Sequence, residues 1–499
     1  MIVKTALLSL LVTLNTNATP LEGALNTLSK APQNIKEIMQ TAPKTYSYES
    51  QFTRSESVSY TGQAFRQILV HDIKKFMNTL KRGGHDEIDT LAALNSYFSY
   101  NESAENDIEG FINGDSFFKV TAKDLSGDRM LIFEGDVFSD VQSPGKNLIK
   151  KIAGNDNALR REELKGWATM KVGAIDLKTV NADAKGDSFA EPEDLVQALY
   201  MTAANNAENA EVFTVKNGNV GVQRISGAYI TEDGLDLAQL TQKLFHGAVS
   251  FSQAARDYLS TDLGANKGLN ADNTKPDKPG KAYTKMEHHF DEAFGYFGAA
   301  RDYLLYSDLE IAKKLSKDTN GDGEISLLSE KNQGLSANFA RMDLIAKANG
   351  YTMDLSASTM KAFTAGRNLI TKKPANYKKY VVAQAQVALS NWERTLGALT
   401  VHYINSTLIQ MNDFGTSKYL FKNHVKFWSE MKGFALSFQF SPVATMTDAD
   451  FDKLHLLVGD KPALHSQGAA KFTAYKASLV KARKLLQSTY SFPESSSNW

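Results

Sequence analysis

The chain has 499 residues, with 56 basic and 56 acidic side chains, 42% apolar residues and no cysteine. This ordinary apolar fraction disfavours extensive disorder, and the zero net charge disfavours a nucleic-acid-binding class, which needs a basic surplus. The lack of cysteine excludes disulfides, thiolate metal ligands and a cysteine nucleophile.

Residues 1–18 have the features of a secretory signal peptide. Lys4 precedes a mostly apolar run of about ten residues that is too short to span a bilayer. Thr16 and Ala18 are the small residues expected before a cleavage site. No later run is long and apolar enough to span a bilayer, so we expect a soluble protein exported to the periplasm or surface of a Gram-negative bacterium. The alternative is a buried N-terminal helix.

Residues 19–55 are polar and contain three prolines, which indicates an N-terminal polar arm. A helical domain is expected over 56–490, with a first helix to about Leu80. A loop-rich insertion interrupts it at about 107–230, where patterns around 117–133 and 211–223 predict β-hairpins and Pro192 starts a helix. Further helices are expected at 233–259, 282–316, 330–349, 354–372, 378–411, 418–439, 447–457 and 465–487. The fold class is therefore all-α, a helical bundle with minor β elements and a disordered tail at 491–499.

The segment 285–298 holds the side chains best suited to bind a metal ion. His288 and His289 precede Glu292 by four and three residues, so that both lie within one helical turn of its carboxylate. Neutral imidazole and carboxylate are ligands for hard-to-borderline metals, and Asp291 is a further candidate. The remaining ligands would come from other helices. The alternative is a hydrogen-bonded pair on a helix surface.

Residues 318–330 match the beginning of a calcium-binding loop. Oxygen-bearing side chains occupy positions 1, 3 and 5, glycine occupies position 6, and an apolar residue occupies position 8. Position 12 is Ser329, and the expected glutamate comes one place late. The predicted calcium-binding residues are Asp318, Asn320, Asp322, Glu324, Ser326 and Glu330. The alternative is a polar turn between helices.

Several short segments between residues 46 and 465 form a shared pattern. They are Tyr46-Ser47-Tyr48, Ser57 to Gln63 with Arg66, Leu237 to Leu240, Asp291 to Gly298, Trp428 to Phe438, and Gly459-Asp460 with Pro462. This pattern resembles the bacterial domain-of-unknown-function family 4856, which is similar to the imelysin-like proteins. These are exported helical proteins associated with iron uptake, and their His-x-x-Glu motif is matched by His289 to Glu292. The resemblance implies an imelysin-like bundle that binds iron or a small iron complex. The family's common lipoprotein cysteine is missing.

Three hypotheses about function remain open. The first is an exported metal-binding protein with iron or zinc at His289 and Glu292, assisted by His288 or Asp291, and with an outer-membrane transport partner as a candidate. The second is a metal-dependent hydrolase with Glu292 or Glu287 as the general base. The third is a non-catalytic surface-interaction protein. We expect no nucleic-acid partner, and the sequence leaves open whether the protein is an enzyme.

Overall fold

A computed structural model describes residues 19–99, 122–123, 130–133, 146–178 and 191–499. The predicted signal peptide lies outside the described residues, as does much of the predicted insertion, including residues 117–121 of its first hairpin.

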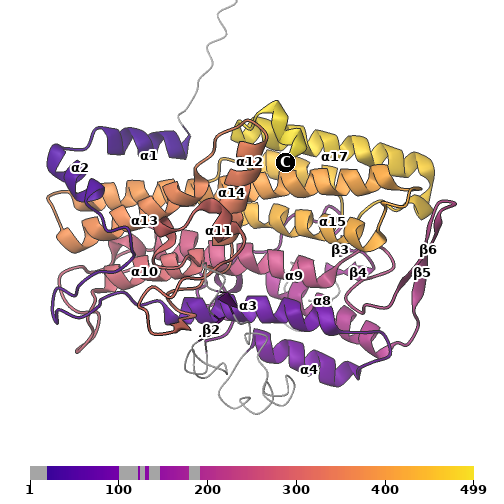
Figure 1. Ribbon diagram of the computed structural model, residues 1–499, viewed down its shortest axis with the longest axis horizontal. Coiled ribbons are helices and arrows are strands. Elements are labelled where there is room, and N and C mark those ends of the chain that lie inside the picture. Colours follow the sequence, from indigo (N-terminus) through magenta and orange to yellow (C-terminus); the bar gives the residue numbers. More distant parts are fainter. Residues whose placement is uncertain (1–18, 100–121, 124–129, 134–145, 179–190) are drawn as a thin grey trace, which may run out of the picture.

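The long helix α14 (Tyr377–Asp413) lies at the centre of the molecule (Figure 1). It packs against α13 (Leu355–Lys372), α15 (Phe421–Leu436) and α17 (Ala469–Tyr490). Below this group, α9 (Leu237–Phe245) packs against α15 and α3 (Thr61–Thr79), and α4 (Glu87–Phe98) packs against α3 and α8 (Pro192–Glu208). The prediction of an all-α bundle is confirmed.

Aromatic and aliphatic stripes on the central helices fill the core. Trp392 and Leu396 of α14 are completely buried, as are Trp428, Met431 and Phe434 of α15. A fully buried large side chain contributes about 2–3 kcal/mol by its removal from water, so these stripes hold the layers together. None of the helices in the described part of the chain has the length and apolar character that crossing a bilayer requires.

Shorter helices and turns complete the bundle. The other α-helices of the described residues are α1 (Pro20–Ser29), α2 (Gln33–Gln40), α10 (Lys285–Phe297), α11 (Asp308–Ala312), α12 (Ser336–Ala348) and α16 (Asp448–Val458). Two π-helical segments, η3 (His246–Phe251) and η4 (Ala254–Tyr258), follow α9. The 3₁₀ segments are η2 (Ile152–Gly154), η5 (Gly268–Asn270), η6 (Tyr303–Leu305), η7 (Ser437–Phe440), η8 (His465–Gln467) and η9 (Glu494–Asn498).

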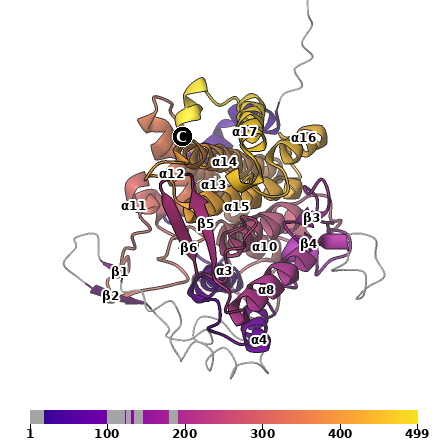
Figure 2. The same cartoon turned by 90° about the vertical axis from the view of Figure 1, so that its right-hand side faces the viewer.

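The described strands form small sheets. The hairpin β5 (Phe213–Asn217) and β6 (Gly221–Ile225) turns at Gly218, where φ is 53°, and it faces the viewer in Figure 2. This hairpin was predicted from its sequence, and it is confirmed. The other pairings are β3 (Lys171–Val172) with β4 (Ile175–Asp176), and β2 (Met130–Phe133) with both β1 (Ala122–Lys123) and β7 (Glu324–Ile325).

The predicted single helix over 282–316 is wrong. α10 ends at Gly298, whose φ of 78° is the left-handed conformation that stops a helix, and the chain restarts as η6 and α11. The apolar spacing continues past this glycine, which is why periodicity alone overestimated the length. The helix α4 was not predicted.

Both ends of the described chain are more ordered than expected. Residues 19–55 are not a simple polar arm, because α1 packs on α14 and α2 packs on α13. The tail 491–499 is not disordered, because it forms η9 and buries Trp499. Asn405 of α14 donates to the carbonyls of Ser496 and Trp499 at 2.9 and 3.0 Å, and these bonds fix the tail.

Candidate functional site

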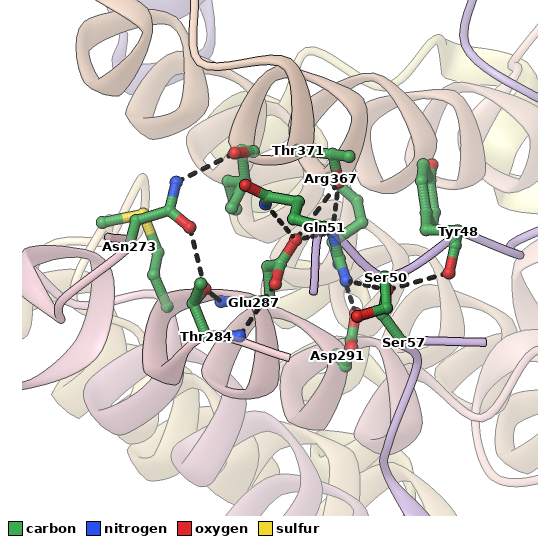
Figure 3. A network of polar contacts seen from close by, with 12 residues as sticks. Tyr48, Ser50, Gln51, Ser57, Asn273, Thr284, Glu287, Asp291, Arg367 and Thr371 are labelled. Atoms are coloured by element: carbon green, nitrogen blue, oxygen red, sulfur yellow. Dashed lines mark hydrogen bonds and ion pairs between the residues drawn. The ribbon is translucent and has the colours of Figure 1, made fainter. Parts of the chain in front are cut away.

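The position of α10 is set by a buried ionic network around Arg367 of α13 (Figure 3). Its guanidinium donates to Asp291 Oδ1 and to Glu287 Oε1, each at 2.9 Å, and all three side chains are fully buried. A third bond reaches Ser57 Oγ at 2.9 Å, which ties the N-terminal segment to both helices. An Arg–carboxylate triad of this kind holds elements in register, since removal of one partner leaves a buried charge uncompensated.

Glu287 and Asp291 also form hydrogen bonds outside their contacts with Arg367. Glu287 closes the capping box of α10 by accepting from Thr284 N at 2.8 Å. Asp291 also accepts from the Tyr46 hydroxyl at 2.9 Å and from Ser59 N at 3.2 Å. Both carboxylates are thus fully buried and paired within the protein, and Asp291 faces Arg367 of α13.

The two histidines of α10 are held by backbone carbonyls. His288 Nδ1 lies 3.0 Å from Ser59 O, and His289 Nδ1 lies 3.1 Å from Gly268 O. A carbonyl only accepts, so Nδ1 carries the proton and Nε2 keeps its lone pair. Burial lowers the pKa of both histidines, although the Asp291 charge opposes this at His288 and the Gly268 carbonyl opposes it at His289. Both rings are thus neutral near pH 7.

Glu292 is the carboxylate that faces this histidine pair. Its Oε1 lies 3.9 Å from His288 Nε2 and accepts a hydrogen bond of 2.8 Å from Gln63 of α3. Burial raises the pKa of Glu292, while His289 and the Gln63 bond oppose that rise. Gly295, one turn later, allows the close approach of α3 that brings Gln63 here, because a Cβ at this glycine would lie 2.8 Å from the Cβ atoms of Gln63 and Tyr60.

His288, Glu292 and Gln63 line a pocket of about 290 Å³, and His289 is not among its lining residues. Its wall also contains Tyr258 and Tyr283 and four basic side chains, Arg66, Lys146, Lys151 and Lys281, with Glu292 as the one carboxylate of the described lining. Sequence reasoning gave Gln63 and Arg66 no role, although both occur in the segment 57–66 that carried the family resemblance. Their spacing on α3 shows no sign of a partner more than 220 residues away.

The pair His288 and Glu292 could share one cation. Ligand atoms about 2.1 Å from a tetrahedral ion lie about 3.4 Å apart, so a small side-chain rotation would bring Nε2 and Oε1 to that spacing. Among the residues that the structure describes, no group of three or more His, Asp and Glu side chains is arranged to hold one ion. A metal here would therefore take its other ligands from solvent or from a bound molecule.

The loop 318–330 adopts the expected turn in its first half. Asp318 accepts from Gly321 N at 2.6 Å and from Gly323 N at 2.9 Å, and both glycines have positive φ. Asn320 Oδ1 accepts from Asp322 N at 3.0 Å. The residue at position 8, Ile325, is fully buried in β7. The side-chain oxygens of Asp318, Asn320 and Asp322 therefore gather at the start of the loop.

The late glutamate closes the loop in a different way from the expected bidentate ligand. Glu330 Oε1 accepts from Thr319 N at 2.7 Å and from Asn320 N at 3.3 Å, and Oε2 accepts from Ser326 N at 2.9 Å. The side chain is buried, so it fastens the two ends of the loop together. A carboxylate oxygen can accept two hydrogen bonds, so these contacts leave Oε2 with capacity for a cation.

The fold and the site together define a helical-bundle protein with a polar pocket lined by residues of α3 and α10. The chain belongs to the family described as "Domain of unknown function (DUF4856)", whose model matches residues 188–454. The matched region contains α10, the loop 318–330 and the central helices, and α3 lies outside it. No curated protein and no solved structure matches the chain closely enough to add to this assignment.

Proposed function

We propose that the protein is an exported metal-binding protein whose metal centre is formed by His288 and Glu292, with His289 next to it on α10. One observation supports this most strongly: His288 gives its Nδ1 proton to a backbone carbonyl, which leaves its Nε2 as a ligand atom 3.9 Å from Glu292 in the wall of the same pocket. Metal-binding histidines are oriented in this way in known sites.

Iron is the metal we favour, with zinc as the second candidate. Imidazole and carboxylate suit both ions, and the resemblance of His289 to Glu292 to the imelysin-like His-x-x-Glu motif favours iron uptake or handling. The pocket of about 290 Å³ has room for an ion with further small ligands. A small iron complex is therefore a candidate cargo, and an outer-membrane transporter is a candidate partner.

Metal content measured by mass spectrometry tests this proposal. The parent protein should carry iron or zinc, and the variant His288→Ala/Glu292→Ala should carry at least tenfold less, since both ligands are lost. His85→Ala is the matched control, because His85 is exposed and remote from α10. Equal metal content in the parent and the double variant would contradict the proposal, provided that both melt as folded proteins.

Export has its own test. N-terminal sequencing of the mature protein from its native host should begin at Thr19, directly after the predicted cleavage site. A mature chain that retains residues 1–18 would contradict export through a cleaved signal peptide.

We propose that the loop 318–330 binds calcium in a structural role. The clustered oxygens of Asp318, Asn320 and Asp322 support this, as does the turn at Gly323. Calcium should raise the melting temperature of the parent protein, and Asp322→Ala, which removes one ligand side chain, should abolish the rise. The absence of a calcium-dependent shift in the parent would contradict this role.

A hydrolase is the weaker alternative, and we assign no catalytic step. Of the two general bases considered for it, Glu287 is fully buried in the ionic network and already paired. Glu292 is the remaining candidate base.

A further inference from the structure

A second cavity, of about 590 Å³, lies between α3, α9, α11, α12 and α15, well within the size range of small-molecule sites. The helices α3, α9 and α15 lie one above another in Figure 1. The lining is markedly basic. Six lysines contribute, from α3, from α9, and from the segments after α11 and before α12: Lys74, Lys75, Lys243, Lys313, Lys314 and Lys331. Arg341 of α12 adds a seventh positive charge.

The lysines occupy different depths in this cavity, which we call the lysine pocket. Lys243 is buried and pairs with Glu430 at 3.4 Å. Lys74 and Lys331 are half-buried along the walls. Lys75, Lys313 and Lys314 are exposed and form the rim. The lysines therefore extend from the solvent-exposed rim to the buried interior, and they are more than a solvated surface patch.

Positive charge outnumbers negative charge in the described lining of the pocket. Glu430 is the one carboxylate among the described lining residues. This excess of positive charge contributes to lowered lysine pKa values. Burial and the charge of Lys243 lower the pKa of Lys74 to about 7. Burial and Lys314 lower the pKa of Lys331 to about 8. Lysines held this close together are stabilised in their charged form when an anion binds between them.

Buried hydrogen-bonding groups also line the pocket. Asn332 is 1% exposed, and its Oδ1 accepts from Ala300 N at 2.8 Å, which fixes the orientation of the amide. Its Nδ2 is a buried donor with no partner in the described structure, and His246 Nδ1 is in the same condition. Native proteins rarely leave such groups unsatisfied unless water, an ion or a ligand completes them. His246 also begins the π-helical segment η3, and such segments are frequent at functional sites.

We propose that the lysine pocket binds a small multivalent oxyanion, a compound that carries several phosphate or carboxylate groups. The lysines supply the charge, and the buried side chains of Asn332 and His246 supply directed hydrogen bonds. This site is separate from the proposed metal centre, which lines a different pocket and shares no lining residue with it.

Calorimetric titration of the full mature chain tests the proposal, with inorganic triphosphate and citrate as probes at fixed ionic strength. At least one probe should bind, and the preference between them identifies phosphate or carboxylate chemistry. The variant Lys74→Met/Lys331→Met keeps the aliphatic stems and removes two charges, so its affinity should fall at least tenfold. Lys74→Arg should retain most of the binding, because the charge is kept.

The control is Lys481→Met/Lys484→Met, which removes two exposed lysines of α17 far from the pocket lining. It should bind the probe within twofold of the parent. The pocket variant should also unfold cooperatively without ligand, which shows that its loss of binding is not a loss of folding. Three results would overturn the proposal. The pocket variant could bind the probe as tightly as the parent, the control could lose as much affinity as the pocket variant, or neither probe could bind measurably.

Discussion

Arg367 shows how one buried residue determines the geometry of a distant site. It contacts Glu287 and Asp291 of α10 with hydrogen bonds of 2.9 Å, and none of the three side chains is exposed. His288 and His289 lie on the same helix, between these two carboxylates in the sequence. The rotation of α10, and therefore the direction of His288 and Glu292, depends on this contact.

Replacing Arg367 should strongly destabilise the protein. In Arg367→Met two carboxylates lose their shared partner while remaining buried, and we expect a loss of about 3–5 kcal/mol in the free energy of unfolding. Urea denaturation measures it. The control is Arg224→Met on the exposed face of β6, which should change stability by less than about 0.5 kcal/mol. If Arg367→Met loses as little free energy of unfolding as Arg224→Met, then the ionic network contributes little to stability.

His424 of α15 should make stability depend on pH. It is completely buried, and burial lowers its pKa to about 4 from an ordinary value near 6.5. As the pH falls below 6.5, the unfolded chain takes up a proton that the folded chain refuses until about pH 4, so stability is lost across this window. The loss from this group is about 3 kcal/mol between pH 7 and pH 4.

The variant His424→Leu should therefore flatten the pH dependence. Its free energy of unfolding should fall about 3 kcal/mol less than that of the parent between pH 7 and pH 4. His85→Leu, at an exposed position, should leave the parent's slope unchanged. If His424→Leu keeps the parent's slope, then His424 is protonated in the folded protein at mild pH.

At the scale of single residues, the sequence predicted that His288 and His289 lie within one helical turn of Glu292. This was possible because residues three or four positions apart in the sequence are neighbours on a helix. The sequence could not show that Asp291 pairs with Arg367, since that contact joins residues 76 positions apart. The lysine pocket was equally hidden. Its doublets Lys74-Lys75 and Lys313-Lys314 are visible in the chain, but only the fold brings them together.

The approach of two elements, α3 and α10, depends on Gly295. This glycine has ordinary helical backbone angles, so alanine would by itself favour the helix by about 1 kcal/mol. Its Cβ, however, would lie 2.8 Å from the Cβ atoms of Tyr60 and Gln63, which cannot move without moving the backbone of α3. The steric effect should therefore outweigh the helix propensity.

We expect Gly295→Ala to lower stability by about 1–3 kcal/mol and to separate Gln63 from Glu292. Gly23→Ala in α1 is the matched control, because nothing lies within 4 Å of its added Cβ, and it should raise stability by about 0.5–1 kcal/mol. Thermal and urea denaturation of both variants measure the difference. A stabilising effect of Gly295→Ala would show that α3 and α10 are not closely packed there.

Element positions were predicted well where apolar periodicity was strong and clear breakers followed. Helices α13 and α14 begin and end within about two residues of the expected limits, which is the range over which helix ends ordinarily fray. The helix over 282–316 was overestimated because Gly298 takes a left-handed conformation that its neighbours in sequence do not signal. The helix α4 was missed because its apolar face is narrow and its surroundings are rich in glycine and aspartate.

For the whole molecule, both ends of the described chain contribute to the bundle. The N-terminal segment reaches Arg367 through Ser57, and the C-terminal Trp499 is buried and held by Asn405 of α14. Their polar composition predicted an arm and a free tail, because the burial of a few aromatic residues among polar ones depends on tertiary contacts. Apolar periodicity along the chain did predict the fold class correctly: the described chain forms an all-α bundle with minor β elements.

The two pockets give this bundle two different chemistries, a proposed cation site on α10 and a proposed anion site between α3, α9 and α12. The metal centre is the central claim, because the proposed function depends on it. It requires one ion to contact residues of the same helix at a defined place in the pocket.

Anomalous X-ray scattering from crystals of the native protein, recorded at the iron and zinc absorption edges, tests that claim most directly. The proposed function predicts a peak about 2.0–2.3 Å from His288 Nε2 and from a Glu292 carboxylate oxygen, with His289 in or next to the coordination sphere. A metal-containing crystal whose only anomalous peaks lie away from this pocket would contradict it.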